Sequence, residues 1–172
     1  GEGFCRILTN AAGGNIKYYK VAGLMGKKIN APIGWTHLEC IPTNARKFFN
    51  VSKGKLAIIE MASVVGLEQV PLGQRNPKYF STKGVGELIR IASEGGADAI
   101  LIGIGGSATS DLGLGALEEL GLKFCHKIRI TPANWENIKQ VRGEIRLEIP
   151  QISIACDVNN PLLGPNGAAS VY

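Results

Sequence analysis

Short apolar runs alternate with helical patterns along the chain, and this alternation is typical of an α/β protein. Patterns suited to strands cover residues 16–21, 27–35, 55–60, 99–102, 123–130 and 149–156. Helical patterns lie in residues 1–14, 61–67, 87–95 and 112–120. The 27–35 strand is the weakest prediction because Pro32 lacks the N–H that a strand interior uses. We therefore expect a sheet with helices packed beside it.

The stretch from Ala99 to Gly121 joins a strand, a glycine-rich turn and a helix. The sequence GIGGSATSD, which follows the apolar run, suits neither a strand nor a helix interior. Glycines allow the backbone to approach a ligand closely, and N–H groups at a helix start face negative charge. We expect this turn to bind an anionic group. The residues expected to contact that group are Gly105, Gly106, Ser107 and Thr109.

The predicted strand at residues 149–156 also ends in a polar turn, which opens with Asp157 and runs through Asn159 to Pro161. In open α/β sheets, ligands bind beyond the carboxyl ends of the strands. If the two strands are near neighbours, the glycine-rich turn and Asp157 face the same crevice. Asp157 can then hold Mg²⁺ or accept a proton from a substrate hydroxyl, or it can form a local Asx-turn.

Three further side chains are candidates for the same site. Asp111 can act as a second carboxylate, in a catalytic or metal-binding role, or it can cap the following helix. Arg75 can clamp a carboxylate through paired hydrogen bonds, and Lys83 can neutralise a phosphate, although many such cations are only solvated. His37 and His126 have no evident partner and are assigned structural roles.

The glycine-rich turn fits no nucleotide-binding fingerprint completely. Gly103, Gly105 and Ala108 match G-x-G-x-x-A, but the acid that would hold a ribose about 20 residues later falls inside the predicted helix, at Glu118 or Glu119. The phosphate-binding sequence G-x-x-x-x-G-K-[ST] does not occur. The turn by itself therefore predicts a general cradle for phosphate or carboxylate.

Composition narrows the class of protein. The 172 residues suit one domain, and the net charge of +5 is spread over the chain. Few aromatic residues and no RNA- or DNA-binding motif indicate no nucleic-acid partner. No signal peptide or apolar stretch of membrane-spanning length is recognisable, so we expect a cytoplasmic protein with no membrane partner. The four cysteines lack close spacing and are expected to be buried thiols.

Two regions are harder to interpret. Residues 36–52 carry the sequence Arg46-Lys47-Phe48-Phe49, for which we favour a solvated loop with two packed aromatics over a partner-binding patch. The chain begins without Met and ends just after a predicted helix start, which indicates a fragment.

Three motifs taken together resemble the bacterial-type glycerate kinase family. They are GIGGSATSDLG at 103–113, RNPKYFSTKGVGELI at 75–89 and CDVNNPLLGPNGAA at 156–169. The run AIIEMASVVGL at 57–67 and the opening GEG at 1–3 agree in order and spacing. The resemblance covers nearly the whole chain except the 36–52 region, and ordered motifs are more specific than any single one.

The resemblance implies ATP- and Mg²⁺-dependent phosphorylation of D-glycerate, at the 2-hydroxyl. It implies a three-layer α/β sheet with flanking helices, in which residues 1–172 form mostly the inserted second domain of a two-domain protein. The family's N- and C-terminal segments do not occur in this sequence, so a chain of this extent is expected to be inactive alone. A homo-oligomer is left open. The implied roles are base or metal ligand for Asp157, second carboxylate or cap for Asp111, and anion partners for Arg75 and Lys83.

The sequence departs from the family pattern within the matched motifs. Ser110 and Leu112 replace an asparagine and a glycine, and hydroxyl residues are usual where this chain has Val65, Phe80 and Val85. These departures leave open a diverged homologue with a changed substrate preference.

Two other classes of function are alternatives. A nicotinamide-dependent oxidoreductase would be supported by a ribose-binding acid at the end of a strand beside Gly103. A non-catalytic ligand-binding or assembly module is favoured by the truncated ends and by the lost hydroxyls.

Overall fold

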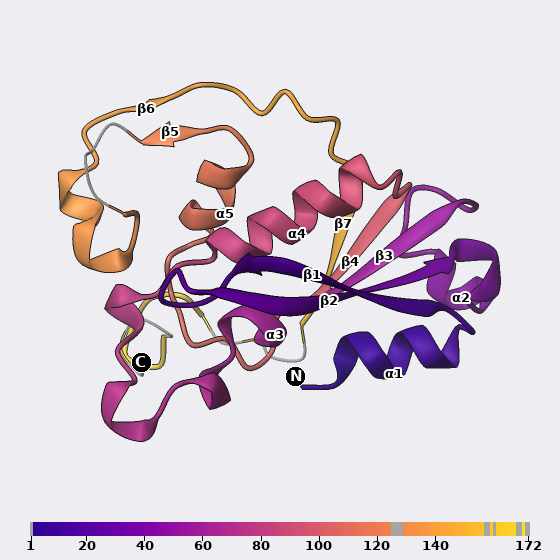
Figure 1. Cartoon of the computed structure of the whole chain (residues 1–172), viewed down its shortest axis with the longest axis horizontal. Coiled ribbons are helices and arrows are strands. Elements are labelled where there is room, and N and C mark those ends of the chain that lie inside the picture. Colours follow the sequence, from indigo (N-terminus) through magenta and orange to yellow (C-terminus); the bar gives the residue numbers. More distant parts are fainter. Residues whose placement is uncertain (1, 125–128, 157–158, 160, 168–169, 171–172) are drawn as a thin grey trace.

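The computed structural model describes residues 2–124, 129–156, 159, 161–167 and 170 (Figure 1). Its main sheet has the strand order β1-β2-β3-β4-β7. These strands are β1 (Asn15–Ala22), β2 (Lys28–His37), β3 (Lys55–Glu60), β4 (Ala99–Gly103) and β7 (Gln151–Ala155). The short strands β5 (Lys123–Phe124) and β6 (Val141–Arg142) pair separately.

Five α-helices and several 3₁₀ turns connect the strands. The helices are α1 (Phe4–Ala11), α2 (Thr43–Arg46), α3 (Ala62–Val65), α4 (Lys83–Glu94) and α5 (Leu114–Glu119), counted over the described residues. The 3₁₀ turns are η1 (Leu38–Cys40), η2 (Leu67–Gln69), η3 (Leu72–Gln74), η4 (Pro77–Tyr79) and η5 (Pro132–Asn137).

The main sheet has an antiparallel half and a parallel half. β1, β2 and β3 pair antiparallel, whereas β3, β4 and β7 pair parallel. In the parallel half Gly103 at the end of β4 lies beside Ala155 at the end of β7. The two strands whose ends carry polar turns are therefore direct neighbours, as the crevice hypothesis requires.

Helices cover both faces of the sheet, because successive strand residues point to opposite sides. In β3, Ala57 and Ile59 belong to the large core cluster that includes Leu88 of α4. Leu56 and Ile58 belong to a smaller cluster with Cys5 of α1. Figure 1 shows α1 and α4 on opposite sides of the strands. The expected α/β architecture of a sheet flanked by helices is confirmed.

Pro32 lies inside β2, and the predicted strand forms in spite of it. It is paired with Tyr18 of β1, but the pairing of β2 with β3 begins only at Ile33. At Pro32 the strand has a partner on one side only, so one side of its backbone carries no ladder bond for the proline to remove.

Helix and strand boundaries differ from the predictions, most clearly in α4, α5 and β5. α4 begins at Lys83 and not at residue 87, and α5 covers Leu114–Glu119 and not 112–120. Leu112 and Gly113 have φ of 52° and 75°, so the left-handed backbone there delays the start of α5. Of the strand expected at 123–130, β5 takes 123–124, and residues 125–128 lie outside the described residues.

The expectations for the two aromatics and for the cysteines are confirmed only in part. Phe49 is buried, but Phe48 is exposed, so only one of the two aromatics packs. Cys5 is buried, whereas Cys40 and Cys156 are exposed, and the expectation of buried thiols is wrong for these two. Cys125 and His126 lie outside the described residues. In the part of the chain that the structure describes, no helix has the length and apolar character to cross a membrane.

Candidate functional site

The glycine-rich turn, residues 104–111, begins at the carboxyl end of β4 and is fastened to the segment that follows β3. The N–H of Met61 donates to the carbonyl of Gly103 at 2.9 Å, and that of Leu67 donates to Gly106 at 2.9 Å. The N–H of Ala108 donates to Val65 at 2.7 Å. These bonds hold the turn in place from one side, so its position is set by the sheet and not by the loop alone.

Glycine is required at position 103, where β4 ends, and at position 106 in the turn. A Cβ at Gly103 would lie 2.6 Å from the Phe4 ring, and Gly106 has a φ of +79°. The N–H groups of Gly105 and Gly106 donate to no acceptor among the described residues. Gly106 is exposed and Gly105 half-buried. The turn therefore presents backbone donors at the place where α/β proteins bind ligands.

The hydroxyls of Ser107 and Thr109 in the turn make local hydrogen bonds. Ser107 Oγ donates to the carbonyl of Thr109 at 3.2 Å and accepts from the Thr109 N–H at 3.3 Å. Thr109 Oγ1 donates to the carbonyl of Phe80 at 3.1 Å. Both residues are half-buried. The structure therefore brings Ser107 and Thr109 together with Gly105 and Gly106, and Thr109 ties the turn to the segment before α4.

Asp111 is almost completely buried, with 1% of its surface exposed. Its Oδ2 accepts hydrogen bonds from the N–H and the hydroxyl of Thr82, at 2.7 and 2.8 Å, and from the N–H of Gly115 at 3.2 Å. Its Oδ1 accepts from the N–H of Gly113 at 3.1 Å. These contacts place the carboxylate at the start of α5, as a helix cap would be placed.

Thr82 completes this arrangement, and the sequence analysis did not single it out. It is the residue that precedes α4, and its hydroxyl accepts from the N–H of Ala116 in α5 at 3.1 Å. Asp111 and Thr82 therefore join the N-terminal ends of α4 and α5. A threonine directly before an apolar helical pattern was the available signal.

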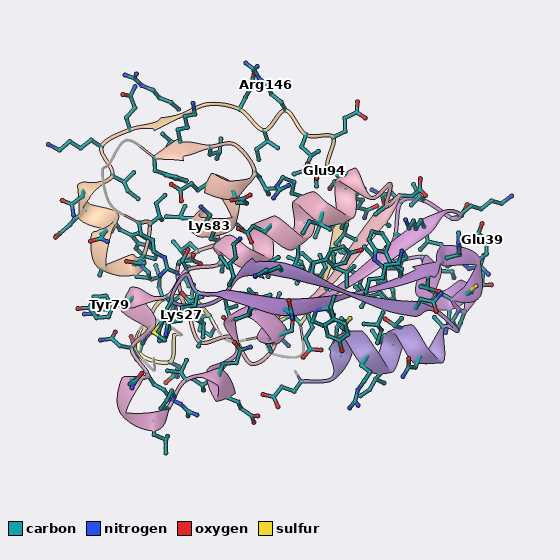
Figure 2. The ribbon with its side chains drawn as sticks, in the orientation of Figure 1. Lys27, Glu39, Tyr79, Lys83, Glu94 and Arg146 are labelled. Carbon is teal, nitrogen blue, oxygen red and sulfur yellow. The ribbon has the colours of Figure 1, made fainter. Side chains whose placement is uncertain are left out.

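The two candidate cations lie in different environments. Lys83 is the first residue of α4, and its ammonium is 3.7 Å from a carboxylate oxygen of Glu119 in α5. Figure 2 labels Lys83 at this end of α4. Arg75 is exposed, and its Nε donates to the carbonyl of Val70 in its own loop at 3.0 Å. The structure thus places Lys83 beside the Asp111–Thr82 junction, and it gives Arg75 a contact within its loop.

Asp157 lies outside the described residues, so its predicted role stays a prediction. The chain position that leads to it is described as far as Cys156, directly after β7. Within the described part of the chain, no group of three or more His, Cys, Asp or Glu side chains could hold a metal ion.

Two buried glutamates were missed by the sequence analysis. Glu60 ends β3 beside Gly103, and its oxygens accept from the N–H groups of Gly3 and Cys5 at 3.1 and 3.0 Å. Glu87 of α4 accepts from the ammonium of Lys28 at 2.9 Å and from the N–H of Ala22 at 2.7 Å. Each joins a helix to the sheet. For each of these glutamates, the only signal in the sequence was a single acidic residue within an apolar pattern.

A further acidic pair lies near the start of α1. A side-chain hydrogen bond with Glu68 raises the pKa of Glu2, and burial and the neighbouring charges of Glu68 and Glu60 act in the same direction. The carboxyl groups of this region therefore interact with one another, and protonation of one of them relieves their repulsion.

The residues that depart from the family pattern have clear structural positions. Val65, Phe80 and Val85 are buried, and all three belong to the large core cluster. Leu112 is exposed and has a left-handed backbone, which is unfavourable for any residue other than glycine. Three departures therefore lie in the core, and Leu112 introduces strain directly after the turn.

The fold and the site define an α/β protein whose sheet presents a glycine-rich, donor-bearing turn at the carboxyl end of a parallel strand. Comparison with known sequences identifies the family within this class. Residues 1–172 match the glycerate kinase family, and the chain belongs to that family.

Relatives in the curated collections carry matching names. The chain is 37% identical over 185 residues to the "Glycerate 2-kinase" of Escherichia coli (strain K12), covering 100% of this chain and 43% of the relative. It is 36% identical over 179 residues to the "Glycerate kinase" of Bacillus subtilis (strain 168), with the same two coverages. The chain therefore spans less than half the length of these relatives.

A solved structure agrees with the sequence comparison. A crystal structure from Salmonella typhimurium LT2 that carries the name glycerate kinase 2 matches with a TM-score of 0.79 and 37% identity. The match covers 100% of this chain and 44% of that one.

Proposed function

We propose that this chain supplies the anion-binding turn of an enzyme that phosphorylates D-glycerate with ATP, giving 2-phosphoglycerate. The observation that carries the proposal is the pair of N–H groups at Gly105 and Gly106, directly after β4 and beside β7, which donate to no acceptor in the part of the chain that the structure describes. Phosphoryl transfer needs positioned groups and neutralised charge more than covalent chemistry. The names of the relatives supply the substrate.

The described residues have distinct parts in this proposal. Gly105 and Gly106 donate their N–H groups to a carboxylate of the substrate or to a phosphate of the nucleotide, and the Ser107 and Thr109 hydroxyls lie next to the same group. Lys83 adds positive charge and exchanges its contact with Glu119 for the bound anion. Arg75 serves as a second anion partner if it leaves its contact with Val70.

The two aspartates differ in the proposal. Asp157, which follows Cys156 after β7, takes the proton of the substrate hydroxyl or binds Mg²⁺, since carboxylate oxygen is a ligand that Mg²⁺ prefers. Asp111, whose oxygens already accept four hydrogen bonds, is proposed to fix the turn as the second carboxylate of the site. ATP and Mg²⁺ are the proposed cofactors, and bound ATP supplies the phosphoryl group.

An ATP-consumption assay with D-glycerate on the full-length gene product tests the proposal. We expect ATP consumption that depends on D-glycerate, whereas the 172-residue chain alone is expected to be inactive. Asp157→Ala should abolish turnover and leave the melting temperature nearly unchanged, with Leu72→Ala as a control at an exposed position outside the turn. An intact, folded protein that consumes no ATP would contradict the kinase proposal, and hydride transfer to a nicotinamide cofactor would favour the oxidoreductase.

A further inference from the structure

An open groove lies on the α1 side of the sheet. It has a volume of about 920 Å³, and its floor includes Leu56, Ile58 and Leu101 of β3 and β4. Phe4 and Leu8 of α1 form part of one wall, and Phe48 forms part of the other. Among the described residues, no charged side chain lines it. The groove therefore suits an apolar occupant and offers no partner for a buried charge.

The groove wall opposite α1 is fixed to the sheet. The hydroxyl of Ser153 in β7 donates to the carbonyl of Phe48 at 2.9 Å, and Phe49 is buried in the same cluster as Leu56. Apolar surface is nevertheless exposed there, because Phe48 is 77% exposed and Leu101 of β4 is only half-buried. The groove is thus a formed surface whose apolar groups face water.

Strand direction indicates what covers such a surface. Sheets made only of parallel strands occur almost only with both faces covered, so a parallel region is expected to carry a layer on each face. β3, β4 and β7 are parallel, and one face of this half packs against α4 in the large core cluster. On the other face, α1 packs on β2 and β3 but the groove remains open over β4 and β7.

We propose that this groove, lined by Phe48 and Leu101 over β4 and β7, receives an amphipathic helix from the part of the glycerate kinase fold that lies outside these 172 residues. The relatives have more than half of their length outside the match, which is enough to supply it. A helix laid on the sheet is the usual third layer of an α/β fold. This inference rests on family membership and not on the proposed activity.

The location of the groove gives the docked helix a second consequence. Gly103 and Gly105 line the groove at the end of β4, so the groove reaches the glycine-rich turn. A helix seated there excludes water from one side of that turn. Docking therefore completes the surroundings of the proposed anion site as well as the core.

Cys40 provides a direct measure of docking, because it is exposed and lines the groove. In a chimera, this chain replaces the matched segment of the Escherichia coli relative. The rate at which maleimide labels Cys40 is then measured by peptide mass spectrometry. We expect labelling at least about tenfold slower in the chimera than in the 172-residue chain. A cysteine introduced by Leu72→Cys, at a position that is 80% exposed and outside the groove, should be labelled equally fast in both.

A second arrangement guards against a chimera that does not fold. The flanking segments of the relative are co-expressed with this chain as separate polypeptides, and co-purification is measured for wild type, Phe48→Asp and the control Leu72→Asp. We expect Phe48→Asp alone to abolish association. The proposal is overturned if Cys40 is labelled equally fast in a folded chimera and in the 172-residue chain. It is also overturned if Phe48→Asp does not weaken association, or if the co-expressed wild-type polypeptides do not associate. A dimer of the 172-residue chain that protects Cys40 overturns it in favour of a second copy.

Discussion

The two faces of the five-stranded sheet differ in how completely they are covered. On the α4 face, Leu88 and Ile100 are fully buried in a cluster that runs from β1 to β4. On the α1 face, Leu56 and Ile58 are buried, but Leu101 of β4 is only half-buried and Phe48 is 77% exposed. The contrast indicates that the α4 face supplies most of the stability of this chain, whereas the α1 face is open where the groove lies.

The largest expected effect comes from shortening one side chain on each face of the sheet and comparing the losses of stability. Leu88→Ala removes a fully buried side chain and should lower the free energy of unfolding by about 3 to 4 kcal/mol. Phe48→Ala, in the groove of the α1 face, should cost less than about 0.5 kcal/mol, because the side chain is already mostly in water. Urea denaturation of both variants measures the difference. Equal losses would show that the α1 face is a core of the isolated chain.

The second prediction concerns the polar junction of the α4 face. Asp111→Ala leaves the N–H groups of Thr82, Gly113 and Gly115 without their acceptor, and should cost about 2 to 3 kcal/mol. Ser110→Ala, at the exposed neighbouring position, should change stability by less than about 0.5 kcal/mol. Thermal melts distinguish the two. A normal melt for Asp111→Ala would favour a role confined to chemistry.

The third prediction uses the strained residue of the turn. Leu112→Gly should raise the free energy of unfolding by up to about 1 kcal/mol, since glycine adopts a φ of 52° without steric cost. Leu72→Gly, at an exposed leucine without a positive φ, should lower it by a few tenths of a kcal/mol, as expected for added chain entropy. Denaturant midpoints measure both. A loss of stability in Leu112→Gly would mean that the leucine side chain packs usefully.

The smallest expected effect lies near the start of α1. The pKa of Glu2 is raised above its ordinary 4.5, so its protonated form stabilises the folded state at low pH, and that stabilisation is lost as the pH rises through the raised value. Glu68→Ala should return the pKa of Glu2 toward 4.5. Carboxyl NMR titration measures it, with Glu94→Ala as a control on α4. An unchanged Glu2 titration in Glu68→Ala would remove this interaction from the account.

The strands and the layer arrangement could be predicted from the sequence because apolar patterning decides them. The whole span of β3 follows from KLAIIE, and β4 follows from AILI. The start of α4 could not be predicted, because Gly84 and Gly86 look like a turn. A Cβ at Gly84 would collide with the backbone of Ala22, and one at Gly86 would lie 2.6 Å from the carbonyl of Ala116. These glycines serve close packing, which patterning does not reveal.

The candidate site was predictable only in part. The glycine-rich turn and its place beside the end of β7 follow from local sequence and strand order. The pairing of Asp111 with Thr82 does not, because it joins two helix starts that are 29 residues apart in the chain. The burial of Val65 likewise depends on tertiary packing, since the same valine could line a pocket as easily as a core.

The central claim is that the turn after β4 binds an anionic group through its backbone N–H donors. The most direct measurement is a ¹⁵N–¹H NMR titration of the labelled chain with ATP and then with D-glycerate. The account predicts saturable shifts of the Gly105 and Gly106 resonances, with Gly13 and Gly73, whose Cα positions face open space, unmoved. Resonances of Gly105 and Gly106 that stay fixed at saturating concentrations of both ligands would contradict it.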